Sequence, residues 1–252
     1  MTPAPPRPSA PGAEPHRTGG FRAPRRVADW PLARAEKRLL VAIARRLPGW
    51  VSPDRLTALA LVAALVTGAA YALTSRGLGW LHVASLGLAV HWFGDSLDGT
   101  LARVRRQRRE RYGYFVDHQA DAAAAVLILG GLALSSLMRP TIALALLAGY
   151  LLMMALVHAV ALTRRTFRLG VAGVGPTEVR IVLVAANTAV WATGNPAVGQ
   201  SSLTAFDGAG LAAAVLFAVA WVVSTLAEAR ALNRLDPPPP RAPRRPDGPS
   251  PR

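Results

Sequence analysis

Six long apolar segments constrain this chain more than any other feature of its sequence. A helix of about 20 apolar residues crosses the roughly 30 Å hydrocarbon core of a bilayer. Hydrophobic residues make up 52% of the 252 residues and charged residues 17%, and that charged fraction is below the roughly 25% of soluble domains. The segments span residues 56–74, 80–96, 115–137, 141–162, 179–193 and 211–226. The sequence therefore predicts an all-α, polytopic membrane protein with six transmembrane helices.

Basic residues predict the orientation of the helices. The net charge is +15, and the chain has 29 Lys and Arg residues. All but Arg76 and Arg139 lie in one of three places: near the N-terminus, in or beside the connections after the second and fourth segments, or near the C-terminus. Because cytoplasmic loops are enriched in Lys and Arg, we expect both termini and these connections in the cytoplasm, and the protein in a bacterial inner membrane. A nucleic-acid-binding protein of this basicity would be poorer in apolar residues, so no nucleic-acid partner is expected.

The remaining segments divide the chain further. Residues 1–31 and 233–252 are rich in Pro and Arg and have few apolar residues to offset the entropy of ordering, so we expect a disordered arm and a disordered tail. Residues 32–50 alternate apolar side chains (Leu39, Leu40, Ile43, Leu47) with basic ones, which predicts an interfacial amphipathic helix. Residues 51–232 form the predicted six-helix domain. The chain has no cysteine, which excludes disulfides, thiol catalysis and thiolate metal sites.

Four aspartates lie where a membrane protein usually avoids charge. Asp95 and Asp98 end the second apolar segment, and Asp117 and Asp121 begin the third. A charge at membrane depth costs roughly 2.5–3.5 kcal/mol. Spacings of three and four residues place each pair on one helix face, and a short loop brings both pairs to the same depth. Oxygen ligands without Cys or His favour Mg²⁺ or Mn²⁺, with room for one or two ions. The alternative is that nearby arginines neutralise the carboxylates.

These aspartates belong to a longer pattern, Asp95-x-x-Asp98-Gly99-x-x-Ala102-Arg103, then nine residues, then Gly113-x-x-x-Asp117-x-x-x-Asp121. The pattern resembles the signature of the CDP-alcohol phosphotransferase family, also called CDP-alcohol phosphatidyltransferases. The resemblance covers about residues 53–226. It implies a six-helix membrane enzyme of phospholipid biosynthesis that is usually a homodimer and has its active site on the cytoplasmic side.

The resemblance also implies roles for individual residues. The four aspartates would hold two Mg²⁺ or Mn²⁺ ions, and Asp121 would be the catalytic general base that takes the proton of the acceptor hydroxyl. The residues that would contact the CDP-linked donor are Asp54, Thr57, Asp98, Gly99, Ala102, Arg103 and Gly113. Simpler interpretations stay open: Asp54 is also a good helix-start residue, Gly99 suits a helix end, and Arg103 resembles an ordinary cytoplasmic arginine.

Two features beside this pattern allow more than one interpretation. His118 follows Asp117, as in the D-H-x-x-D variant of choline and ethanolamine phosphotransferases, and is interpreted as catalytic, as a neighbour of the metal site or as a surface histidine. In the connection 104–112, five arginines replace the small residues common in the family. They favour either capture of an anionic lipid or simple determination of topology.

A second polar cluster predicts the acceptor site. Arg164, Arg165 and Arg168 precede a Gly-rich stretch that leads to Glu178 and Arg180. In family members with phosphorylated acceptors, basic residues near the fourth and fifth helices bind that phosphate. We therefore expect Arg164, Arg165, Glu178 and Arg180 to contact an acidic acceptor such as a sugar phosphate or polyol phosphate. The alternative is that Glu178 and Arg180 form a structural pair.

Three classes of function account for parts of the sequence. The first is an enzyme that transfers a phosphatidyl group from CDP-diacylglycerol to an alcohol and releases CMP, or, as an alternative within the family, one that transfers phosphocholine or phosphoethanolamine from its CDP derivative to diacylglycerol. The second is a cation or proton transporter, but the acids cluster at one membrane face with no relay at the midplane. The third, a basic membrane scaffold, leaves the four aspartates unexplained. The sequence favours the first class.

Overall fold

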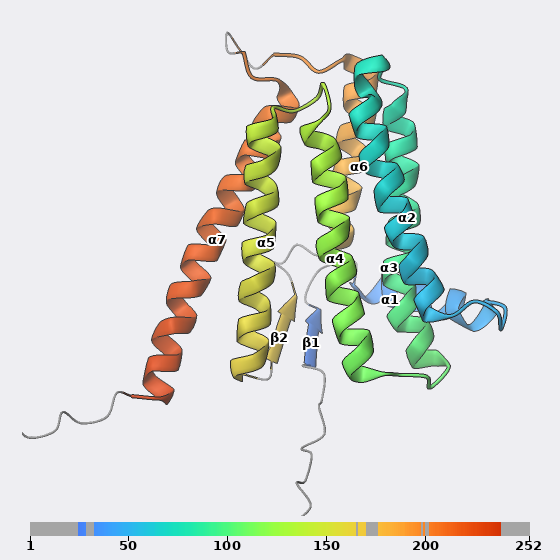
Figure 1. The fold of residues 1–252 in the computed structure, drawn as a ribbon, viewed down its shortest axis with the longest axis vertical. Coiled ribbons are helices and arrows are strands. Elements are labelled where there is room, and N and C mark those ends of the chain that lie inside the picture. The colour runs from blue at the N-terminus through green and yellow to red at the C-terminus, as the bar shows by residue number, and fades with distance from the viewer. Residues whose placement is uncertain are drawn as a thin grey trace, which may run out of the picture.

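The computed structural model describes residues 25–28, 33–164, 166–169, 176–197, 199 and 202–237. Within these ranges the fold is an elongated bundle of helices, with α1 and a pair of short strands at one end (Figure 1). The helices are α1 (Ala33–Arg46), α2 (Pro53–Ala72), α3 (Trp80–Val104), α4 (Glu110–Ala133), α5 (Pro140–Arg164), α6 (Pro176–Thr193) and α7 (Ala205–Leu235), with a short 3-10 helix, η1 (Leu73–Arg76), after α2. Each of the six predicted apolar segments therefore corresponds to one helix, from α2 to α7.

Local capping fixes where α2 and α7 begin. Ser52 caps α2 by accepting a hydrogen bond from the backbone N–H of Arg55 at 3.3 Å, and Pro53 occupies the first turn, where its missing N–H costs nothing. Thr204 and Asp207 form a capping box at the start of α7, with 3.1 Å hydrogen bonds in both directions.

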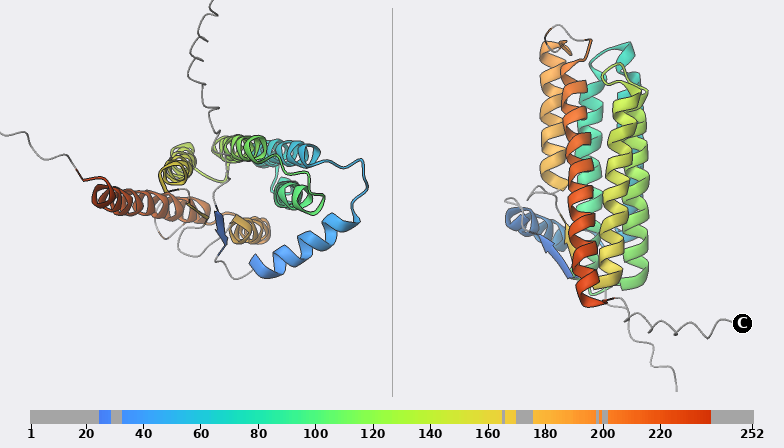
Figure 2. Two further views of the ribbon diagram at one scale, coloured as in Figure 1. Left: turned by 90° about the horizontal axis from the view of Figure 1, so that it is seen from below. Right: turned by 90° about the vertical axis from the view of Figure 1, so that its left-hand side faces the viewer.

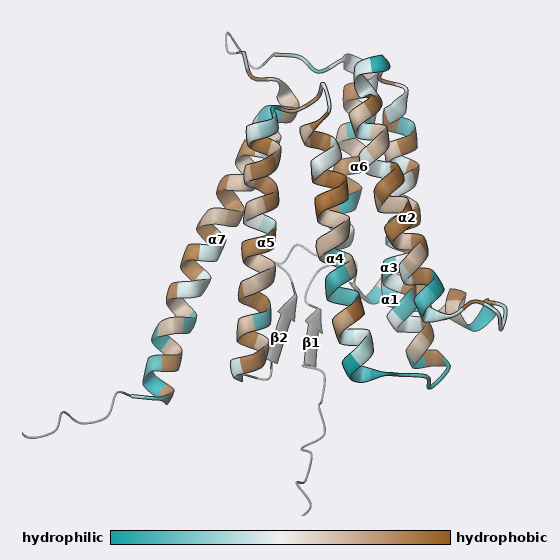
Figure 3. Cartoon of the chain, in the orientation of Figure 1, coloured by the Kyte–Doolittle hydropathy of each residue, from teal (hydrophilic) through white to brown (hydrophobic). Residues whose placement is uncertain are grey.

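Four of the described helices are long and apolar enough to cross a membrane, namely α2 with η1, α4, α5 and α7. Figure 3 shows the apolar middle of these helices and the hydrophilic lower ends of α4 and α7. Large apolar side chains such as Leu65, Val182 and Val219 are exposed on the outside of the bundle, where water would disfavour them and lipid would not. The protein is a multi-pass membrane protein. The helices α3 and α6 are not among these four, and both carry polar residues described below.

Close packing of α2 against α3 and α4 forms the centre of the bundle. Glycines allow this approach: a Cβ atom on Gly131 of α4 would overlap the backbone of Gly68 on α2, and one on Gly94 of α3 would lie 2.6 Å from the carbonyl oxygen of Leu56. Small residues are the usual means by which membrane helices come this close. The packing holds α3 and α4, the helices of the aspartate pattern, on either side of α2.

The helix α1 forms in the segment expected to be interfacial. It runs across the bundle axis at the lower end, so that it is seen lengthwise when α2 to α6 are seen end-on (Figure 2). Part of its apolar face packs on the protein, since Leu40 and Ala44 join Leu97 and Leu101 of α3 in a buried cluster, whereas Leu39 is exposed. The helix is therefore attached to the end of α3.

A short parallel strand pair was not expected from the sequence. β1 (Arg25–Ala28) pairs with β2 (Thr166–Leu169), which lies between α5 and α6. β1 belongs to the segment 1–31, for which we predicted disorder. The rest of that segment and residues 238–252 of the predicted tail lie outside the described residues, so disorder there stays a prediction.

Candidate active site

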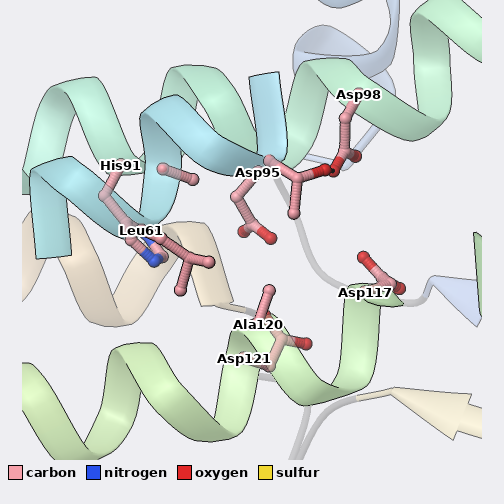
Figure 4. A pocket seen from close by; sticks show the side chains of 9 residues that line it. Leu61, His91, Asp95, Asp98, Asp117, Ala120 and Asp121 are labelled. Atoms are coloured by element: carbon pink, nitrogen blue, oxygen red, sulfur yellow. Dashed lines mark hydrogen bonds between the residues drawn. The ribbon is translucent and has the colours of Figure 1, made fainter. Parts of the chain in front are cut away.

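A small pocket lies between α2, α3 and α4 and contains all four aspartates of the pattern. Its volume is about 10 Å³, roughly that of one water molecule. In Figure 4 the side chains of Asp95 and Asp98 on α3 and those of Asp117 and Asp121 on α4 are turned toward the space between the helices. The pocket is lined by Thr57, Ala60, Leu61, His91, Asp95, Asp98, Asp117, Ala120 and Asp121. The two aspartate pairs therefore meet at one pocket, as their helical spacing predicts.

The carboxylate of Asp98 is held by α2. Thr57 donates a hydrogen bond of 2.6 Å to Asp98 Oδ2, and the backbone N–H of Gly99 donates to Oδ1. Only 8% of Asp98 is exposed. A buried carboxylate without donors would be strongly disfavoured, so the Thr57 hydroxyl contributes directly to keeping Asp98 at this position.

Arg180 reaches the pocket from α6. Its guanidinium donates a 2.6 Å hydrogen bond to Asp95 Oδ2, and both side chains are mostly buried. A hydrogen bond between two charged groups is stronger than one between neutral groups. The predicted acceptor residue Arg180 and the predicted metal ligand Asp95 are thus direct partners, although they are 85 positions apart in the sequence.

An aromatic cluster flanks the pocket between α4 and α5. His118 lies 3.7 Å from the Asp117 carboxylate, and its Nδ1 forms a 2.7 Å hydrogen bond with the backbone oxygen of Tyr114. The His118 ring is centred 4.4 Å from that of His158 on α5. Because His118 is only 6% exposed, its interpretation as a surface histidine is wrong.

Two arginines of the basic connection hold local structure. Arg109 donates hydrogen bonds of 2.8 and 2.6 Å to Asp54, and its guanidinium lies 3.8 Å from the centre of the Tyr112 ring. These hydrogen bonds raise the pKa of Arg109 above its already high usual value. Arg105 donates to the backbone oxygens of Leu47 and Pro48 in the turn between α1 and α2. The connection therefore contacts both the start of α2 and the end of α1.

One comparison with known proteins covers the residues of the signature pattern. A family model described as CDP-alcohol phosphatidyltransferase matches residues 50–226. The chain belongs to that family. It is therefore an enzyme of phospholipid synthesis that transfers a substituted phosphate from a CDP-linked donor to an alcohol. A comparison with curated proteins found no match.

Gly99 and Gly113, two small residues of the signature of the CDP-alcohol phosphatidyltransferase family, lie beside open space. A Cβ on Gly113 would meet no atom within 4 Å, and one on Gly99 would meet only Arg103 Nη1 at 3.6 Å. Both glycines therefore leave space that no neighbouring helix fills. Arg103 donates a 2.8 Å hydrogen bond to Thr100 on its own helix. Ala102 lies one turn after Asp98 on α3.

The predicted acceptor residues are only partly described. Arg164 is the last residue of α5, and Arg165 lies outside the described residues. Glu178 is in the first turn of α6, and Arg180 follows it. Arg180 is hydrogen-bonded to Asp95, one of the metal-ligand candidates.

The donor set suits a hard cation. Among the described residues, no group of three or more His, Cys, Asp or Glu side chains is arranged to hold a metal ion; Asp95 and Asp98 instead bind Arg180 and Thr57. The types of ligand nevertheless fit Mg²⁺ or Mn²⁺, because four carboxylates from two helices line one pocket.

Two residues near the site were missed by the sequence analysis. His91 lines the pocket and is 6% exposed; it precedes Asp95 by four residues, so helical periodicity could have placed it on the same face. Glu36 of α1 contacts Thr177 on α6. No local sequence signal links these two positions, which are 141 residues apart.

Proposed function

We propose that this enzyme transfers a phosphatidyl group from CDP-diacylglycerol to the hydroxyl of an alcohol and releases CMP. One observation carries the proposal: the four aspartates of α3 and α4, together with Thr57 of α2, line a single pocket. Carboxylates placed so close together are costly near a membrane unless cations offset their repulsion. Transfer of a phosphatidyl group from a diphosphate donor to an alcohol would use bound divalent cations, and these would offset the repulsion.

In this proposal Asp121 acts as the general base. Its carboxylate takes the proton from the acceptor hydroxyl, and the hydroxyl oxygen attacks the donor phosphorus that carries diacylglycerol. A new phosphorus–oxygen bond forms to the acceptor while the bond between the two donor phosphates breaks, and CMP leaves with the electron pair of that bond. Asp121 lines the pocket on α4 opposite Asp95 (Figure 4), which supports a position beside the reacting groups.

The residues that would hold two divalent ions are Asp95, Asp98, Asp117 and Asp121. Bound Mg²⁺ or Mn²⁺ would supply positive charge that offsets the negative charge of the donor diphosphate. The side chains themselves provide the oxygen ligands, and Thr57 keeps Asp98 turned into the pocket through its 2.6 Å hydrogen bond. Donor contacts by Asp54, Gly99, Ala102, Arg103 and Gly113 belong to the same proposal.

We propose that the acceptor carries a phosphate, as a polyol phosphate or sugar phosphate does. Arg180 supports this choice, since it brings a cation from α6 to the edge of the pocket, 2.6 Å from Asp95. Guanidinium groups bind phosphate oxygens in pairs. Arg164, Arg165 and Glu178 complete the proposed acceptor site.

The membrane arrangement is part of the proposal. We propose that α3 and α6 also cross the bilayer, which gives six transmembrane helices in a bacterial inner membrane. At about 1.5 Å per residue, the 25 residues of α3 are long enough to span the hydrocarbon core. Both termini, α1 and the active site would face the cytoplasm. The proposed homodimer rests on the family resemblance alone.

A CMP-release assay with defined substrates tests this function. Purified protein in lipid vesicles is given CDP-diacylglycerol, Mg²⁺ or Mn²⁺, and either phosphorylated or unphosphorylated polyols. We expect CMP together with a new phospholipid, and faster release with the phosphorylated acceptors. If CMP appears only when CDP-choline or CDP-ethanolamine is supplied with diacylglycerol, the donor assignment is wrong.

A further inference from the structure

Glu36 connects the helix α1 to two helices of the bundle. Its Oε1 atom accepts hydrogen bonds from Thr177 of α6 at 2.7 Å and from Trp92 and Ser96 of α3 at 2.9 and 3.4 Å. Hydrogen bonds to an ionised acceptor are stronger than those between neutral groups. The Glu36 carboxylate therefore links α3 to α6, and we call its hydrogen bonds with Thr177, Trp92 and Ser96 the brace.

The brace lies next to the pair of charges at the pocket. Thr177 is three residues before Arg180 in the first turn of α6, and Ser96 follows Asp95 on α3. Arg180 and Asp95 are themselves joined at 2.6 Å. Glu36 thus ties together the same two helices that the Arg180–Asp95 pair joins, about one helical turn away.

Farther along α6, the buried side chain of Asn187 forms hydrogen bonds with Tyr71 of α2 and Ser85 of α3, so the Glu36 contact concerns the first turn of the helix. Among the described helices, α3 is the one against which α6 packs extensively. A second link comes from the same N-terminal region, because β1 pairs with β2 in the connection that leads to α6. β1 and Glu36 therefore contact this part of the chain at two points, at β2 and at Thr177 in the first turn of α6.

We propose that Glu36 is a positioning residue for acceptor binding. By holding the first turn of α6 against α3, it keeps the Arg180 guanidinium directed at the Asp95 side of the pocket. The N-terminal helix thereby determines how well the enzyme recognises the phosphate of its acceptor. This inference rests on the proposed function, in which Arg180 contacts the acceptor.

The competing explanation is that Glu36 only attaches α1 to the bundle. Thr177→Val separates the two roles, because it removes the bond to α6 and leaves those to Trp92 and Ser96. We expect the KM for the phosphorylated acceptor to rise roughly three- to tenfold, as loss of a hydrogen bond to a charged group allows, with little change in kcat or in the KM for the donor. The matched control is Thr188→Val, whose exposed hydroxyl on α6 bonds only to its own helix at Val184.

Variants at Glu36 itself provide a rescue test. Glu36→Ala removes the brace and should raise the acceptor KM at least as much as Thr177→Val. Glu36→Gln keeps an oxygen that accepts hydrogen bonds, so it should restore most of the loss. The two changes in Glu36→Ala with Thr177→Val should not add, because they break the same contact. Additive effects would contradict the proposal.

A distance measurement tests the brace without any activity assay. The chain contains no cysteine. A variant with Lys37→Cys on α1 and Val182→Cys on α6 therefore takes up spin labels at these two positions alone. We expect the distribution of label-to-label distances to widen when Thr177→Val is added and to stay unchanged with Thr188→Val.

The outcomes distinguish this proposal from the proposed function. An unchanged distance distribution in Thr177→Val would overturn the brace, and a wider distribution with an unchanged acceptor KM would show that Glu36 has no part in acceptor binding. If the wild-type protein releases no CMP from any donor, the proposed function fails, and the brace is judged on the distance distributions alone.

Discussion

At the scale of single residues, Thr57, which donates a hydrogen bond to Asp98, is a direct way to probe the pocket. Thr57→Val keeps the shape of the side chain but removes the 2.6 Å hydrogen bond to the buried carboxylate. We expect a loss of about 1–3 kcal/mol of stability and lower activity, measured by thermal unfolding in detergent and by CMP release. Thr193→Val, at an exposed hydroxyl on α6, is the control and should change neither.

Arg180 gives a second prediction at this scale. Arg180→Gln removes the charge that we assign to acceptor phosphate, so the KM for a phosphorylated acceptor should rise about tenfold or more, as expected for a lost charged hydrogen bond. The KM for CDP-diacylglycerol should change much less. Arg234→Gln, at an exposed position near the end of α7, should behave like the wild type. A donor KM that rises as much as the acceptor KM would argue against this role.

The residues that could be predicted from sequence are those whose partners are close in the chain. Asp95 with Asp98, and Asp117 with Asp121, follow from helical spacing. The bonds between Asp54 and Arg109 and between Glu36 and Thr177 join positions 55 and 141 residues apart. Such contacts depend on how the helices pack, and helical periodicity carries no information about them.

At the scale of helices, apolar runs located α2 to α7 but not the ends of these helices. The second apolar segment stops at residue 96, whereas α3 continues to Val104. Polar residues such as Asp98 and Arg103 end a hydropathy signal without ending the hydrogen bonds of a helix. The same difference applies to α7, which extends beyond its apolar segment at both ends.

Two adjacent glycines on α4 test the packing of the bundle. Gly131→Ala places a methyl group against the backbone of Gly68 on α2, whereas Gly130→Ala meets no atom within 4 Å. We expect Gly131→Ala to lower the free energy of unfolding by about 1–3 kcal/mol, as overpacking does, and Gly130→Ala to leave it unchanged or slightly higher. Unfolding of the purified protein by a denaturing detergent measures both. Equal stability of the two variants would mean that α2 and α4 are not in close contact there.

At the scale of the whole molecule, the alternation of basic and neutral connections predicts the orientation in the membrane. The α3–α4 connection carries the cluster of arginines, and the α2–α3 connection carries only Arg76. We expect a membrane-impermeant thiol reagent applied outside intact cells to label Ser75→Cys but not Gln107→Cys. Labelling of both positions from the same side would contradict α3 as a spanning helix.

The fold class followed from the sequence, whereas the arrangement at the lower end of the bundle did not. Six apolar segments are enough to predict a helical membrane protein, because a bilayer leaves few other ways to satisfy the backbone. The docking of α1 on α3 and the pairing of β1 with β2 depend on a few contacts between distant segments. These are the contacts that connect the N-terminal region to the site.

The most direct test of the central claim is the rate of CMP release from CDP-diacylglycerol with and without divalent ions. We predict release that chelation abolishes and added Mg²⁺ or Mn²⁺ restores, a fall of roughly 10²–10⁴-fold in Asp121→Asn, as expected for loss of a general base, and a normal rate in Glu110→Gln, an exposed acid on the same helix. Metal-independent release, or an Asp121→Asn variant as active as Glu110→Gln, would contradict the claim that the aspartate pocket is the site of transfer.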